Sequence, residues 1–114
     1  MVLSSPYCRA QEYSRLAFNQ AQTEPSLELP DFLPADARQR NTEDVLRILA
    51  MMPPSNTNVV MVAHSPNIRD AVGVDLPVEG GAVILKPNAG GKPTVVIKVL
   101  PNEWDTLAQA LGRQ

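Results

Sequence analysis

The most apolar stretch of the chain, Val59–Ala63, is a run of five consecutive hydrophobic residues that leads directly into His64. A short valine-rich run bounded by polar and turn residues is typical of a strand buried in a parallel sheet. Ser65-Pro66-Asn67 then supplies a cap and a helix-start proline for a helix over about 66–72, which Gly73 ends. His64 is therefore predicted to lie where a central strand stops and a helix begins.

The first forty residues are predicted to form a strand, a helix and a loop. Residues 2–6 have the pattern of a short strand, and residues 6–21 follow with a helical pattern. The residues expected on the buried face of this helix are Cys8, Leu16 and Ala17. Residues 22–40 are predicted to be a loop because three prolines interrupt any long helix there, and 27–29 is a candidate brief strand.

The remaining elements complete an α/β pattern. Asn41 or Thr42 is suited to cap a helix that runs to about residue 52. Residues 82–85 and 94–100 are predicted strands joined by a hairpin loop at 88–93, and a closing helix covers about 102–111. The apolar stripes of the two helices are Val45, Leu46, Ile48, Leu49 and Met52, and Trp104, Leu107, Ala108 and Leu111. Alternating helices and strands followed by a hairpin predict a single α/β domain with a mixed sheet.

Composition and charge narrow the classes of partner. The chain has 114 residues, enough for one domain with a real core, and 44% of them are hydrophobic. A net charge of -2 and an aromatic content of 4% give no general reason to expect nucleic acid or a membrane surface as a partner. A single cysteine excludes an internal disulfide and a multi-cysteine metal cluster. No metal and no cofactor are predicted. The cellular compartment stays open.

Two basic residues stand at the ends of predicted strands. Arg9 lies in the first turn of the first helix, where its guanidinium and free backbone N–H groups suit a phosphate or carboxylate. His64 follows the second strand, and if the two strands are parallel neighbours both side chains reach the same sheet edge. The plainer interpretations are a solvated surface arginine and a histidine that merely caps a strand end.

Three segments together resemble one protein family. Val2-Leu-Ser-Ser-Pro-Tyr-Cys-Arg-Ala10 resembles the SSP-x-x-R-A segment of the histidine phosphatase (phosphoglycerate mutase-like) superfamily. Val59–Ile68 resembles its second-histidine strand, and 78–87 resembles the tail of a short-chain bacterial branch. The resemblance implies a three-layer, Rossmann-like mixed sheet. It also implies a parent activity of phosphomonoester hydrolysis through a phosphohistidine intermediate.

The family's site residues carry over only in part. Arg9 matches the second pocket arginine, and His64 matches the second histidine, which binds and stabilises the phosphoryl group. The family's Arg-His-Gly segment precedes the Ser-Ser-Pro segment and has no counterpart in this sequence, which contains one histidine. The fold is therefore expected to be the C-terminal portion of such a domain, incomplete at the N-terminus. Ser65 replaces a usual glycine, and Tyr13-Ser14 replaces a usual Thr-Ala.

These matches predict binding of phosphate or a phosphorylated small molecule by Arg9 and His64, with little or no turnover. The alternative is a non-catalytic product, either truncated or an interaction module that retains the fold. Three loop carboxylates are candidates for a proton-donating acid, although each is also compatible with an ordinary solvated side chain: Glu28, Asp31 and Glu79. An exposed sheet edge is expected to favour self-association.

Overall fold

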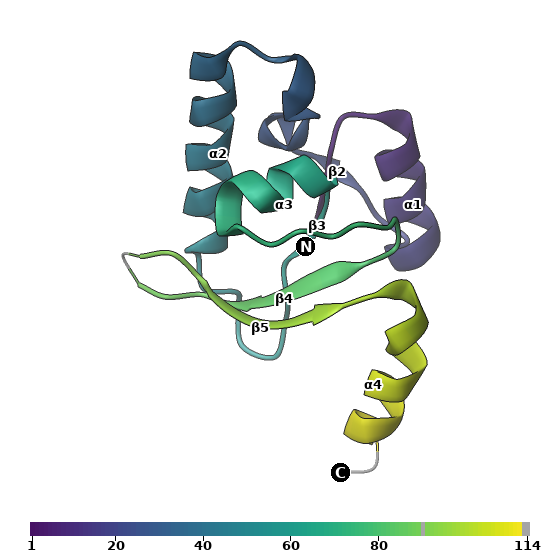
Figure 1. Cartoon of the computed structure of the whole chain (residues 1–114). Helices are drawn as coiled ribbons and strands as arrows, with labels where there is room; N and C mark the ends of the chain where they lie inside the picture. Colours follow the sequence, from purple (N-terminus) through teal and green to yellow (C-terminus); the bar gives the residue numbers. More distant parts are fainter. Residues whose placement is uncertain (90, 113–114) are drawn as a thin grey trace.

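A computed structural model of the chain describes residues 1–89 and 91–112 (Figure 1). Its helices and strands are β1 (Val2–Ser4), α1 (Cys8–Phe18), β2 (Gln22–Thr23), α2 (Ala35–Leu49), β3 (Val60–Val62), α3 (Ser65–Val72), β4 (Ala82–Lys86), β5 (Thr94–Val99) and α4 (Trp104–Gly112), with 3₁₀ turns at Pro25–Leu27, Pro30–Phe32 and Pro101–Glu103. Within the described residues, every helix is too short or too polar to span a bilayer.

The first sheet is parallel and carries the two strands that precede Arg9 and His64. Its order is β2-β1-β3, with Val2 opposite Val60 and Ser4 opposite Val62. The expected parallel pairing of these two strands is therefore present. Helices lie on both sides of this sheet, α1 on one side and α2 and α3 on the other (Figure 1).

The core lies between the parallel sheet and the helices α2 and α3. Its buried cluster joins one strand residue, one 3₁₀ residue and one residue from each of the two helices: Leu3, Leu27, Val45 and Ala71. An ion pair holds the two helices together, because the Arg38 guanidinium donates to both carboxylate oxygens of Asp70, at 2.6 and 2.9 Å. The packing of α2 thus positions α3, whose first turn follows His64.

The hairpin forms a sheet of its own, which corrects the expected single mixed sheet. β4 and β5 are antiparallel, and in the described residues they join no strand of the parallel sheet. The α/β class is right, but the strands divide into a three-stranded parallel sheet and an antiparallel pair. The predicted hairpin loop at 88–93 includes Gly90, which lies outside the described residues.

The segment between α1 and β3 departs from the prediction in two places. The helix α2 begins at Ala35, directly after Pro34, so Asn41 and Thr42 lie inside it rather than at its start. Residues such as alanine, arginine and glutamine favour helix, and a proline just before the first turn does not oppose it. The expected brief strand at 27–29 is wrong, since Pro25–Leu27 is a 3₁₀ turn and the added strand is β2.

Several residues expected in the interior are exposed. α1 turns Ala10 and Ser14 to the sheet, while Cys8, Ala17 and Leu16, which is 82% exposed, face outward. Small side chains let the helix approach closely, and the Ser14 hydroxyl is satisfied because it donates to the Ala10 carbonyl at 2.9 Å. Met52 is 73% exposed because α2 ends at Leu49, before reaching it. The predicted buried strand is an edge strand, so β3 is only half-buried.

Candidate functional site

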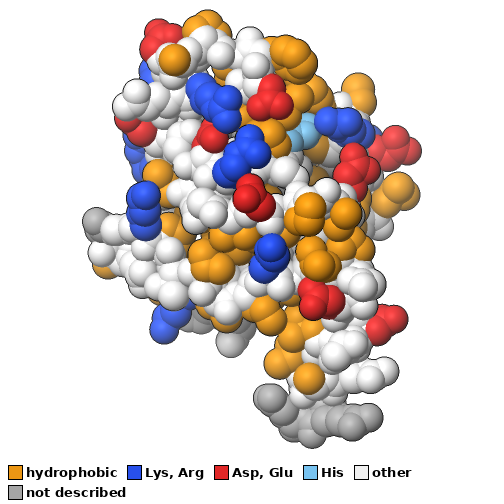
Figure 2. Space-filling view, viewed as in Figure 1, with side chains coloured by type: hydrophobic (Ala, Val, Ile, Leu, Met, Phe, Trp, Pro, Cys, Tyr) orange, Lys and Arg blue, Asp and Glu red, His pale blue; other side chains and the backbone are white. Residues whose placement is uncertain are grey.

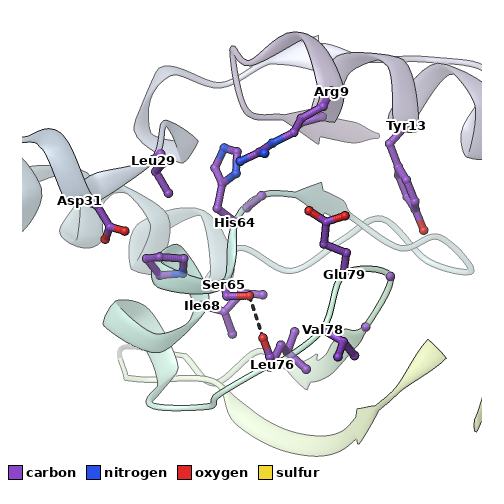
Figure 3. Close-up of a pocket in the computed structure, with 15 residues that line it drawn as sticks. Arg9, Tyr13, Leu29, Asp31, His64, Ser65, Ile68, Leu76, Val78 and Glu79 are labelled. Carbon is purple, nitrogen blue, oxygen red and sulfur yellow. Dashed lines mark hydrogen bonds between the residues drawn. The ribbon is translucent and has the colours of Figure 1, made fainter. Parts of the chain in front are cut away.

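Arg9 and His64 come together at the end of the parallel sheet. β1 leads through Ser5 into α1, and β3 leads into α3, so both side chains lie where a strand gives way to a helix. They line one cavity of about 380 Å³. In Figure 3 the Arg9 side chain, from α1, and the His64 ring, from just after the end of β3, point toward one another. Parallel pairing is the reason, because it places the carboxyl ends of both strands at one edge.

Arg9 stands at a helix start that suits an anion. It is the second residue of α1, it is exposed, and in the described chain the first turn of α1 holds no acidic residue. Tyr7, the residue before the first residue of α1, gives this turn no side-chain capping bond within the described part. The first N–H groups of α1 and the guanidinium of Arg9 thus offer positive charge and hydrogen-bond donors on one side of the cavity.

His64 is held by its backbone. The residue is buried, with 8% of its surface exposed, and its N–H donates to the side-chain oxygen of Asn67 at 2.9 Å. The Asn67 N–H donates back to the His64 carbonyl at 2.9 Å, and the Asn67 amide donates to the Glu28 carbonyl at 2.9 Å. Asn67 therefore caps the start of α3 and ties His64 to the loop after β2.

The imidazole ring is fixed by a residue that the sequence did not single out. Ser5 is fully buried, and its Oγ lies 2.8 Å from Nε2 of His64. The Tyr7 N–H donates to the same Oγ at 3.3 Å. The Tyr7 ring also packs edge-on against the imidazole, with centroids 5.0 Å apart and an interplanar angle of 66°. The Ser-Ser-Pro segment that carries the family resemblance was the signal that could have identified Ser5.

The positive charge beside His64 resides on Arg9. Burial in the first place, and the positive charge of Arg9 in the second, lower the pKa of His64 from its ordinary value. His64 is therefore neutral at neutral pH, and its ring has one N–H to offer. A bound anion would offset the charge of Arg9 and so favour the protonated ring.

The three candidate acids lie in different surroundings. Asp31 and Glu79 line the cavity, and in Figure 3 the Glu79 carboxylate points toward Arg9 and His64. Asp31 lies at the other end of the cavity, with its carboxylate 4.0 Å from the Arg38 guanidinium. Glu28 is not among the lining residues, and its carboxylate accepts a hydrogen bond from Asn41 at 3.4 Å. Of the three, Glu79 is the one placed to act on a group held by Arg9 and His64.

The positions that depart from the family pattern have structural partners. The Ser65 hydroxyl donates to the Leu76 carbonyl at 2.8 Å, drawn as the dashed line in Figure 3. Ser65 therefore joins the start of α3 to the segment that carries Glu79. Tyr13 lines the cavity and is half exposed, whereas Ser14 is buried against the sheet. Neither Ser65 nor Tyr13 lies between Arg9 and His64 in the close-up.

The donor set suits an anion better than a cation. Among the described residues, no group of three histidine, cysteine, aspartate or glutamate side chains is placed to hold a metal ion. Arg9 and His64 instead line the cavity, and Arg9 lies in the first turn of α1, whose first backbone N–H groups have no acceptor within the helix. Comparison with protein-family models, with curated proteins and with solved structures finds no significant match for this chain. The histidine phosphatase likeness therefore stays a prediction from its motifs.

Proposed function

We propose that this chain is a histidine phosphatase-like protein that binds phosphate or a phosphorylated small molecule between Arg9 and His64. The observation that supports this best is the convergence of the two side chains on one cavity from adjacent parallel strands. The guanidinium can bind two phosphate oxygens, the start of α1 adds N–H donors, and the His64 N–H can reach a further oxygen. Glu79, whose carboxylate points toward the same two residues, would then lie beside the ligand.

The same arrangement supports binding without turnover. A covalent phosphoryl transfer needs a nucleophile in line with the leaving oxygen, in addition to positive groups on the other oxygens. His64 is the one histidine of the sequence, and Ser5 is fully buried and engaged with it. By resemblance His64 takes the supporting role, so the chain is expected to hold a phosphomonoester without hydrolysing it.

Phosphate titration observed through the His64 ring signals by NMR tests the binding. Millimolar phosphate should shift these signals in the wild-type chain, and Arg9→Gln should weaken the apparent affinity by at least about tenfold. Arg15→Gln is the matched control, because Arg15 lies in the last turn of the same helix. A folded sample whose ring signals do not move, or an Arg9→Gln variant that binds as the wild type does, would contradict the proposal.

A turnover assay tests the second half of the proposal. The 114-residue chain should give no hydrolysis of p-nitrophenyl phosphate above that of the His64→Ala variant. Robust hydrolysis that disappears in His64→Ala would show that the chain is an active phosphatase and that His64 is essential to it.

A second function, self-association, is favoured by the surface of the hairpin and α4. Val96 is 60% exposed, Leu111 is 58% exposed and Trp104 is 42% exposed. Figure 2 shows hydrophobic side chains gathered over this lower part of the molecule. β5 also has a free edge in the described chain, and two such edges can pair in an antiparallel manner.

We therefore also propose that two copies associate through β5. Light scattering after gel filtration should show a concentration-dependent dimer for the wild-type chain. Val96→Lys should shift the population to monomer, whereas Leu16→Lys, at an exposed site on α1, should leave the dimer unchanged. A wild-type chain that is monomeric at high micromolar concentration would contradict this proposal.

A further inference from the structure

The hydrogen bond between Ser5 and His64 bears on which ring nitrogen of His64 carries the proton. A neutral imidazole has one protonated and one unprotonated nitrogen, and its partners decide which is which. Ser5 Oγ lies 2.8 Å from Nε2, so either the hydroxyl donates to Nε2 or a protonated Nε2 donates to the hydroxyl. The two arrangements differ in what they leave at the other nitrogen, Nδ1.

The surroundings of Ser5 select the first arrangement. The Tyr7 N–H already donates to Oγ, so Oγ accepts one hydrogen bond without His64. If Nε2 also donated to Oγ, the hydroxyl hydrogen would need another acceptor, and Oγ has no further partner among the described residues. Ser5 is fully buried, and an unsatisfied buried donor is costly. The hydroxyl therefore donates to Nε2.

We propose that Ser5 is a positioning residue that keeps the proton of neutral His64 on Nδ1, the nitrogen left for a ligand. The ring nitrogen bonded to Ser5 is Nε2, while the ring itself lines the cavity beside Arg9. The neutral ring then presents a hydrogen-bond donor to an anion without being protonated first. This role in anion binding rests on the proposed function, but the position of the proton does not.

The lowered pKa of His64 agrees with this arrangement. Burial and the charge of Arg9 both favour the neutral ring. A neutral ring with its proton on Nε2 would turn a lone pair toward an anion and repel it. A neutral ring with its proton on Nδ1 binds the anion instead, so the site works at pH values above the pKa of His64.

Long-range ¹H–¹⁵N correlation spectra of the full chain, recorded without phosphate above the pKa of His64, test the proton position directly. The wild type should show a protonated Nδ1 and an unprotonated Nε2. Ser5→Ala should shift the ring toward the form protonated on Nε2, and Ser5→Thr, which keeps a hydroxyl, should retain the wild-type pattern. A wild-type ring protonated on Nε2 overturns the proposal, whether or not Ser5→Ala folds.

Phosphate titrations of the same variants separate this proposal from the binding proposal. Above the pKa of His64, Ser5→Ala should bind phosphate about five- to tenfold more weakly than the wild type. Below that pKa both nitrogens carry protons, and the two affinities should converge, which a general loss of structure would not produce. A protonated Nδ1 without phosphate binding contradicts only the proposed function. Phosphate binding by a ring protonated on Nε2 contradicts only the role of Ser5.

Discussion

The parallel-sheet region (1–72) buries several polar side chains, whereas the hairpin region (82–112) leaves several apolar side chains exposed. In the parallel-sheet region the fully buried side chains include the polar Ser4, Ser5 and Ser14. In the hairpin region Val96 is 60% exposed although it lies in the middle of a strand. Hydrophobicity alone therefore does not decide burial in this chain, and the presence of a covering element does.

Burial of the serines in the parallel-sheet region is possible because each hydroxyl has a partner. Ser4 donates to the Ser5 carbonyl at 3.0 Å, Ser14 donates to Ala10, and Ser5 is bonded to His64. Among the described residues, no buried side-chain nitrogen or oxygen lacks a hydrogen-bond partner. The polar groups at the strand exit thus hold a ring in place at modest cost, whereas the hairpin region keeps an apolar surface uncovered.

Truncation of a core leucine should give the largest effect. Leu27 is 1% exposed and lies in the core cluster, so Leu27→Ala should lower the free energy of unfolding by about 2–5 kcal/mol. Leu16→Ala removes the same atoms from a side chain that is 82% exposed, and it should change the free energy of unfolding by less than about 0.5 kcal/mol. Urea denaturation measures both. Similar losses in the two variants would remove the contrast between covered and uncovered residues.

The hairpin region also contains one buried and one exposed residue of the same type, both in β5. Val99 is 1% exposed, and Val99→Ala should cost about 1.5–3 kcal/mol. Val96→Ala, three residues earlier in the same strand, should cost less than about 0.5 kcal/mol. Thermal unfolding at low micromolar concentration, where self-association is weak, provides the comparison. A large loss in Val96→Ala under these conditions would mean that the exposed face of β5 is covered.

Acidification should act on the parallel-sheet region through His64. The pKa of His64 is lower in the folded chain than in the unfolded chain. As the pH falls, the unfolded chain therefore binds a proton at His64 before the folded chain does. The free energy of unfolding should therefore decline as the pH is lowered below about 6.5, down to the folded pKa. Denaturation midpoints at several pH values should show this decline in the wild type and lose it in His64→Gln. An identical decline in both chains would assign it to another group.

Removal of the neighbouring charge should give the smallest effect. Arg9 is the second cause of the lowered pKa of His64, after burial. Arg9→Gln should therefore raise that pKa only part of the way toward its ordinary value, while Arg15→Gln should not change it. Titration of the His64 ring signals by NMR measures the difference. An unchanged pKa in Arg9→Gln would show that the charge of Arg9 does not reach His64, which would contradict a shared anion site.

The sequence by itself determined the local elements and the pair of basic residues. The valine run before His64, the proline and glycine around α3, and the two hairpin strands are patterns of neighbouring residues, and all appear in the structure. The placement of Arg9 and His64 at one edge also followed from sequence, because parallel strands share a carboxyl end. The exposed Cys8 and Leu16 show where a weak helical pattern misjudges the buried face.

Only the tertiary structure decided which edges pair and which residues meet across the chain. The separation of the hairpin from the parallel sheet and the exposure of Val96 depend on contacts between distant segments, and periodicity does not encode those contacts. The same holds for Ser5, which is 59 residues from His64 in the chain and hydrogen-bonded to it in the fold. A serine at a strand exit is ordinary in sequence, and it becomes a partner of the imidazole because β1 and β3 pair in register.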